Sequence, residues 1–194
     1  VYQEGNASAD HDIAVGLIEN EISGVKFASV GGEAKVGTEI TLAGYGCTTS
    51  SGTGGNDGVL RIGENKVSSF NGFDMVSNLQ GGGALCFGDS GGPAFVKLGN
   101  TMVEHHVVLG VNSKGNIKDT NYNARTDTTE SQEFFAEFAQ QNSVEICGVN
   151  KDCAAGGGGG GGSGSDCAEA MHGADNARTL LNIRMDELKS CIVD

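Results

Sequence analysis

The sequence predicts an all-β fold, an antiparallel β-barrel followed by a C-terminal helix. Runs of β-branched and apolar residues alternate with turns rich in Gly, Asn and Ser, a pattern typical of strands in such a fold. Several runs are short and separated by loops, which favours an antiparallel barrel over a parallel α/β sheet. Charged residues make up only 19% of the chain, which fits a secreted β protein.

Five segments are predicted as strands: residues 38–45, 58–67, 94–98, 102–113 and 122–126. A helix is predicted between Glu130 and Gln141. Its apolar side chains fall on one face, which would pack on the barrel, and they are Phe134, Phe135, Phe138 and Ala139.

The end of the chain predicts a linker and a small helical extension. An unbroken glycine run, residues 156–162, has the composition of a flexible coil. A phosphate-binding loop is the alternative, but no Gly-Lys-Ser/Thr follows the run. Asp166 can then cap a helix that runs through Leu188 and carries one apolar stripe. We interpret that stripe as a docking or anchoring face.

Charge and hydropathy patterning narrow the function classes. The net charge of −13 disfavours nucleic acid, whose phosphates would repel the protein. No apolar run reaches the roughly 18 residues that a membrane-spanning helix needs. The first residues have no charged segment followed by an apolar one, so no signal peptide is predicted there.

The most specific motif is the hexapeptide GDSGGP at residues 88–93. A serine hydroxyl needs a base and nearby N–H donors to act as a nucleophile, and glycines let backbone amides approach a substrate closely. The hexapeptide resembles the nucleophile segment of trypsin-like (chymotrypsin-family) serine proteases. The resemblance implies that Ser90 is the nucleophile and that the N–H groups of Gly88 and Ser90 form the oxyanion hole. It also implies that Asp89 pairs with a new N-terminal ammonium after zymogen cleavage.

Four other segments occur along the chain in the same order as in the family. Residues 11–15 resemble the segment of the triad aspartate, which assigns Asp12 the orientation of the catalytic imidazole. Residues 43–46 resemble a Gly-Trp-Gly strand end, with Tyr45 in place of the tryptophan. Residues 107–115 resemble the strand that pairs with substrate, so that Ser113, Lys114 and Gly115 would line the non-primed side of the cleft. Residues 123–126 and the helix after them resemble the end of the family's domain.

The resemblance covers residues 1 to about 146 and implies the second barrel of the chymotrypsin type plus the end of the first. We therefore expect four parts. Residues 1–15 end the N-terminal barrel, 16–148 form the C-terminal barrel and closing helix, 149–165 form the linker, and 166–194 form a Cys-flanked helical extension.

The family's catalytic histidine lies several dozen residues before the aspartate, but only eleven residues precede Asp12. Residues 2–5 resemble the middle of the preceding loop, so we expect the histidine upstream of Val1 and near-inactivity of the isolated chain. None of the four histidines present occupies the family's base position, and we interpret them as structural or solvated: His11, His105, His106 and His172.

Six cysteines in a family of exported enzymes predict disulfides. The family's usual bridge from Cys86 lacks its partner, because no cysteine follows Gly115 until Cys147. The resemblance places the loop after Gly46 beside the nucleophile loop and so implies a bridge between Cys47 and Cys86. The pairing of the other cysteines stays open. Cys147 and Cys153 have a spacing that is poor for zinc, and we expect no metal.

By its position relative to Ser90, Ala84 stands where trypsins carry an aspartate at the base of the first substrate pocket. The resemblance thus implies that cleavage after Lys or Arg is not favoured, and that an apolar or small side chain is accepted. Asn123 stands about where a pocket-wall glycine is usual, so it would narrow or polarise the pocket.

The resemblance implies a secreted, extracellular or periplasmic, serine endopeptidase that cleaves protein or peptide substrates through an acyl-enzyme on Ser90. We expect no cofactor, and we expect that a complete active site requires the N-terminal barrel. The alternative is a non-catalytic protease homologue that binds partners through its cleft or tail. An Ala-His-Cys segment upstream would favour the enzyme.

Overall fold

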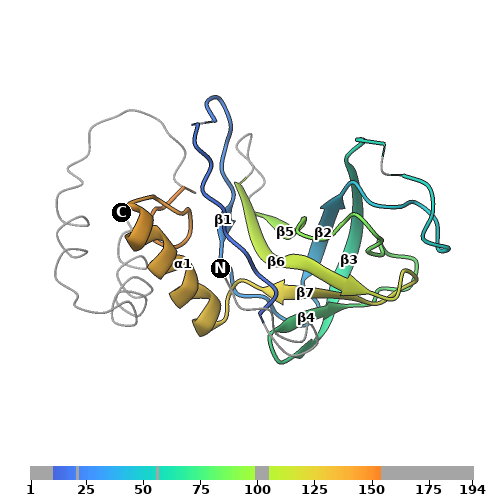
Figure 1. Cartoon of the computed structure of the whole chain (residues 1–194). Helices are drawn as coiled ribbons and strands as arrows, with labels where there is room; N and C mark the ends of the chain where they lie inside the picture. Colours follow the sequence, from blue (N-terminus) through green and yellow to red (C-terminus); the bar gives the residue numbers. More distant parts are fainter. Residues whose placement is uncertain (1–10, 21, 56, 99–104, 154–194) are drawn as a thin grey trace. The chain divides into compact units, whose positions relative to one another are not determined.

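Antiparallel strands make up most of the regular structure in the computed structural model, which describes residues 11–20, 22–55, 57–98 and 105–153 (Figure 1). The elements in chain order are β1 (Ser29–Val30), β2 (Glu39–Gly44), β3 (Arg61–Asn71), β4 (Asp74–Ser77), β5 (Pro93–Leu98), β6 (His105–Gly115), β7 (Asn121–Arg125) and α1 (Thr129–Asn142).

The strands close into a barrel. Each strand pairs antiparallel with the next in the order β2, β3, β4, β7, β6, β5, and β5 pairs again with β2. The short β1 lies outside this ring and pairs parallel with β6. Closure leaves the barrel without a free edge, which removes the exposed backbone donors and acceptors of an open sheet. The predicted all-β barrel of the chymotrypsin type with its closing helix is therefore confirmed.

The barrel interior is filled by the inward-facing side chains of its strands. Ile40 and Leu42 alternate along β2, Val67 and Met75 come from β3 and β4, and Leu109 comes from β6. Burial of each large apolar side chain contributes about 1.5–3 kcal/mol relative to exposure. The period of two in β2 is the signal that predicted this strand.

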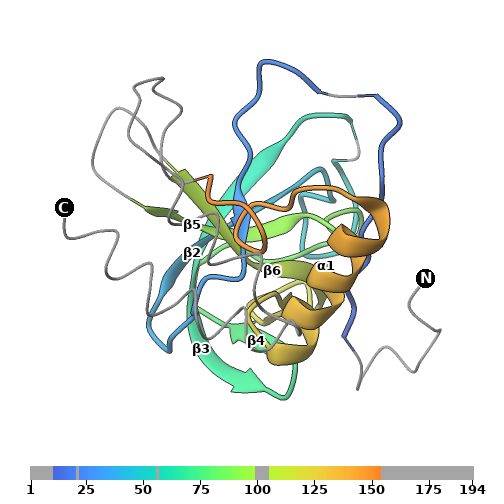
Figure 2. The same ribbon diagram turned by 90° about the vertical axis from the view of Figure 1, so that its left-hand side faces the viewer.

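Helix α1 packs against the outside of the barrel, as both views show (Figure 2). It begins after Thr128, whose hydroxyl accepts a hydrogen bond from the Ser131 amide. It ends at Asn142, and the next residue, Ser143, has a left-handed φ of 51°. Phe135 is buried in a second cluster with Ile13 of the N-terminal segment and Ala124 of β7, and Ala139 is also buried. The predicted apolar face is therefore the packed face.

The strand bounds differ from the sequence prediction mainly at one hairpin. β3 runs to Asn71, four residues beyond the predicted end, and β4 was not predicted. Asn71 pairs with Asp74 across Gly72, which has a φ of 60°, and Phe73. An Asn-Gly pair is a strong hairpin signal. The end of β3 and the whole of β4 were missed because Ser68, Ser69 and Asp74 interrupt the apolar pattern.

Several predictions concern residues that the structure does not describe. Residues 102–104 of one predicted strand, the glycine run and the helical extension lie outside them. The described part of the chain ends at Cys153, and within it Val149 is buried beside α1. No helix among the described residues is both long enough and apolar enough to cross a membrane.

Candidate active site

Ser90 lies on a tight turn that leads into β5. The Gly92 amide donates to the Asp89 carbonyl at 3.0 Å, which closes a four-residue turn around Ser90. Gly88 and Gly91 have positive φ values of 98° and 82°, a region that favours glycine. The glycines of the hexapeptide thus shape a loop that leaves the Ser90 side chain exposed.

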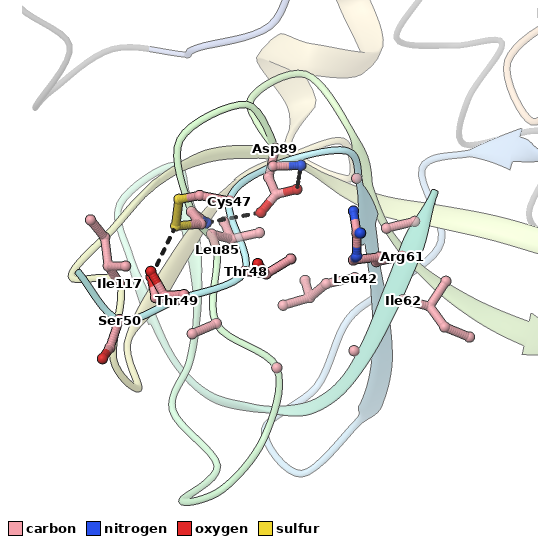
Figure 3. Close-up of a pocket in the computed structure, with 17 residues that line it drawn as sticks. Leu42, Cys47, Thr48, Thr49, Ser50, Arg61, Ile62, Leu85, Asp89 and Ile117 are labelled. Atoms are coloured by element: carbon pink, nitrogen blue, oxygen red, sulfur yellow. Dashed lines mark hydrogen bonds between the residues drawn. A yellow bond between two sulfur atoms is a disulfide. The ribbon is translucent and has the colours of Figure 1, made fainter. Parts of the chain in front are cut away.

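The Asp89 side chain lies at the wall of the pocket drawn in Figure 3 and is held there by main-chain amides. One carboxylate oxygen accepts from the Gly46 amide at 2.8 Å, and the other accepts from the Cys86 amide at 2.9 Å. Cβ atoms on Gly44 or Gly46 would collide with this carboxylate. The strand end at residues 43–46 is glycine-rich because Asp89 packs directly on its backbone.

Strand β6 brings Asp12 to the same region as Ser90. Ser113 donates its hydroxyl proton to the Asp12 carboxylate at 2.6 Å. The main chain of the preceding residue, Asn112, pairs with the turn. Its carbonyl oxygen accepts from the Gly91 amide at 2.9 Å, and its main-chain N–H donates to the Gly92 carbonyl at 2.8 Å. Consecutive residues of one strand therefore contact Asp12 and the Ser90 turn, although 78 positions separate Asp12 from Ser90 in the sequence.

Lys114 and Gly115 continue β6 beyond Ser113. The Lys114 ammonium lies 2.8 Å from a carboxylate oxygen of Asp74 and 5.5 Å from the ring centroid of Tyr122. A Cβ on Gly115 would lie 2.9 Å from the Thr120 carbonyl oxygen. The end of the strand is thus held close to the loop that connects β6 and β7.

Ala84 lines a cavity of about 420 Å³ between the nucleophile loop and strands β2 and β3 (Figure 3). Polar and apolar residues form its wall, among them Asp89, Cys86, Leu42 and Ile62. The cavity therefore lies beside the Asp89 carboxylate.

Arg61 lines the same cavity and forms a two-pronged ion pair with Asp57 at 2.8 and 3.0 Å. This hydrogen bond, together with one from the Val59 amide, holds the pKa of Asp57 far below its usual value. The same pair raises the pKa of Arg61. The positive charge at the cavity rim is thus neutralised locally.

Two disulfides are present among the described residues. Cys47 is joined to Cys86, with Cα atoms 5.3 Å apart, and the Cys47 amide donates to the Phe87 carbonyl at 2.9 Å. This is the pairing that the family resemblance implied. Cys147 is joined to Cys153, a pairing that the sequence left open. Within the described ranges, no group of histidines, cysteines and carboxylates could hold a metal ion.

The described histidines have contacts outside the Ser90 turn. His105 forms a hydrogen bond with the Ser29 hydroxyl at 2.9 Å, His106 packs edge-on against Phe95, and the His11 ring lies against that of Phe73. His172 lies outside the described residues.

One residue at this site was missed by sequence reasoning. The Asn112 side chain donates to the carbonyls of Ala43 and Asp89 at 3.1 and 3.2 Å. The available signal was a polar residue directly after the apolar run 107–111. Asn123, predicted at the pocket wall, is fully buried and donates to Asn112 at 2.8 Å.

One comparison with known proteins, with protein-family models, agrees with the motif. The family model described as Trypsin matches residues 2–136. The solved structure of a mutant of human heparin binding protein (CAP37) is 17% identical, with a TM-score of 0.41, and the match covers 68% of this chain and 55% of that one. The chain thus spans about half the length of that structure. A search of curated proteins gave no significant match.

Proposed function

Because the chain belongs to the trypsin family of serine proteases, we propose that it is the nucleophile-bearing part of a secreted serine endopeptidase. The observation that carries this proposal is the meeting of Asp12 and the Ser90 turn on β6. Ser113 binds the Asp12 carboxylate, and Asn112 binds both glycines that follow Ser90.

In the proposed reaction, the Ser90 hydroxyl oxygen attacks the carbonyl carbon of the scissile peptide bond. A histidine takes the hydroxyl proton and later gives it to the leaving amine, and water then hydrolyses the acyl-enzyme. Asp12 orients this histidine and stabilises its charged form. The hydrogen bond from Ser113 fixes the carboxylate for that role.

The histidine would come from a first barrel outside the described residues. This assignment is supported by the engagement of His105 with Ser29 and of His106 with Phe95. We accordingly propose that residues 1–194 alone are nearly inactive and that the N-terminal barrel completes the site.

The Gly88 and Ser90 amides would form the oxyanion hole, supported by the positive φ of Gly88, which a Cβ would disfavour. Ser113, Lys114 and Gly115 would bind the non-primed side of the substrate. Ala84 offers no carboxylate to a basic side chain, so we propose a substrate whose residue before the scissile bond is apolar or small.

Substitutions in the complete protein test the two proposed catalytic residues. Ser90→Ala removes the nucleophile and should lower kcat for peptide hydrolysis by about a millionfold. Asp12→Asn should lower kcat by about 10⁴-fold, because the amide favours the wrong imidazole tautomer. Asp119→Asn, an exposed loop change of the same kind, serves as the control. Full activity of folded Ser90→Ala would contradict the proposal.

A further inference from the structure

Two buried asparagine side chains form a chain of hydrogen bonds beneath the Ser90 turn. Asn112 on β6 is 2% exposed and Asn123 on β7 is fully buried, and the two residues are direct partners across the strands. The Asn123 amide nitrogen donates to the Asn112 carbonyl oxygen at 2.8 Å. The Asn112 amide nitrogen then donates to the Asp89 carbonyl at 3.2 Å and to the Ala43 carbonyl at 3.1 Å.

The orientation of the Asn112 amide follows from its partners. Both atoms that face its nitrogen are carbonyl oxygens, which only accept hydrogen bonds, so the NH₂ group must point toward Asp89 and Ala43. The Asn112 oxygen then faces Asn123, which must present its own NH₂ group. The order of donation is therefore fixed from Asn123 through Asn112 to Asp89.

The Asp89 carbonyl belongs to the peptide group whose N–H is that of Ser90. This peptide is trans, so its C=O and N–H point in opposite directions. A hydrogen bond that holds the carbonyl inward, toward β6, turns the Ser90 N–H outward. The outward N–H is the donor that we place in the oxyanion hole.

Gly92 makes room for this contact. A Cβ on Gly92 would lie 3.0 Å from the Asn112 amide nitrogen and 3.0 Å from the Asp89 carbonyl oxygen, and it would collide with the Ala43 carbonyl. The last glycine of the hexapeptide is thus needed where the Asn112 side chain meets the turn.

The arrangement leaves one buried polar atom unsatisfied. The side-chain carbonyl oxygen of Asn123 is buried and has no hydrogen-bond partner among the described residues. An unsatisfied buried acceptor destabilises a fold, and an apolar pair of similar size would avoid that cost. The asparagine pair therefore does not serve packing alone.

We infer that Asn112, oriented by Asn123, is a positioning residue that fixes the Asp89–Ser90 peptide and aims the Ser90 N–H into the oxyanion hole. This inference rests on the proposed peptidase function. It adds the strand residues that preorganise one of the two oxyanion donors.

The main test replaces Asn112 by leucine, which has a similar volume and no amide, in the complete protein. Loss of one oxyanion donor lowers kcat by about 10²–10³-fold in a serine protease of another fold. Because Asn112→Leu loosens the donor without removing it, we expect kcat to fall about 10- to 100-fold with KM changed by less than about twofold. An unchanged kcat in the folded variant would overturn the inference.

Gln132→Met is the matched control. Gln132 is also a buried amide, 6% exposed, and it donates to a backbone carbonyl, that of Thr126 at 2.7 Å, but near α1. Its replacement removes an equivalent hydrogen bond and should leave kcat unchanged. An equal fall of kcat in both variants would assign Asn112 a structural role only and so overturn the inference.

Asn123→Leu gives a second, independent variant if Asn112→Leu does not fold. It leaves the Asn112 amide in place without its orienting donor, and we expect a smaller fall in kcat. Where all variants fold, the variant that combines Asn112→Leu with Asn123→Leu should have the same kcat as Asn112→Leu alone, because Asn123 acts through Asn112. Additive effects would contradict this order.

A structural readout separates failure of this inference from failure of the proposed function. In a crystal structure of Asn112→Leu, we expect the Asp89 carbonyl to leave its inward position, whether or not the protein is a peptidase. An unchanged Asp89–Ser90 peptide would overturn the inference. A wild-type protein that hydrolyses no peptide and whose Ser90 is inert would instead overturn the proposed function.

Discussion

Asp89 and Asn112 hold the Ser90 turn from two sides. The Asp89 carboxylate accepts from the Gly46 and Cys86 amides, and the Asp89 carbonyl accepts from the Asn112 side chain. The side chain of Asp89 is thus hydrogen-bonded to one set of segments, and its main-chain carbonyl is hydrogen-bonded to β6. Such support fixes the turn more firmly than its own i to i+3 hydrogen bond could, because that bond contributes only about 0.5–1.5 kcal/mol net.

At the same scale, the Asp57–Arg61 pair at the cavity rim predicts a pH response. The hydrogen bond from Arg61 lowers the pKa of Asp57 below its usual value of 3.8. A carboxylate with a lowered pKa stabilises the fold above that usual value, and the contribution is lost as pH falls toward the folded-state pKa. Arg61→Met should return the pKa of Asp57 toward 3.8, which NMR titration of the carboxyl carbon can measure. An unmoved pKa would exclude Arg61 as its cause.

At the scale of elements, β6 organises the site. Its inward face packs in the barrel through Leu109, while Asn112 and Ser113 bind the Ser90 turn and Asp12. The nucleophile loop is tied from the other direction by the disulfide between Cys47 and Cys86. The loop is therefore anchored both to a strand and to the loop after β2.

The two disulfides should differ in their contribution to stability. Replacing Cys47 and Cys86 by serine opens a loop with a sequence separation of 39, and the free energy of unfolding should fall by about 4 kcal/mol. The same replacement at Cys147 and Cys153 opens a separation of 6 and should lower it by about 2 kcal/mol. Denaturant unfolding monitored by circular dichroism measures both. A larger loss for the short loop would contradict the chain-entropy explanation.

Local patterns predicted most of these elements, and the motif predicted the nucleophile loop. Alternation of apolar residues gave β2, and the apolar face of residues 130–141 gave α1. The role of Asn112 was not predictable, because its partners Ala43 and Asp89 lie 69 and 23 positions away. Hydrogen bonds between distant segments depend on how the barrel closes, which local periodicity does not encode.

At the scale of the whole molecule, barrel closure unites the separate parts of the site. Asp12 comes from the N-terminal segment, Ser90 from the loop before β5, and Ser113 from β6. Only the ring of antiparallel pairs between β5, β6 and β7 places these segments together. Assembly of the site is therefore inseparable from folding of the barrel, and a variant must be shown to fold before its activity is interpreted.

The reactivity of Ser90 in the complete protein tests the proposed function most directly. A fluorophosphonate probe reacts with a serine that a base activates, and peptide mass mapping locates the labelled residue. We predict a single label on Ser90, with none on the Ser90→Ala variant. A folded complete protein that stays unlabelled would contradict the proposed endopeptidase and favour a non-catalytic homologue that binds partners.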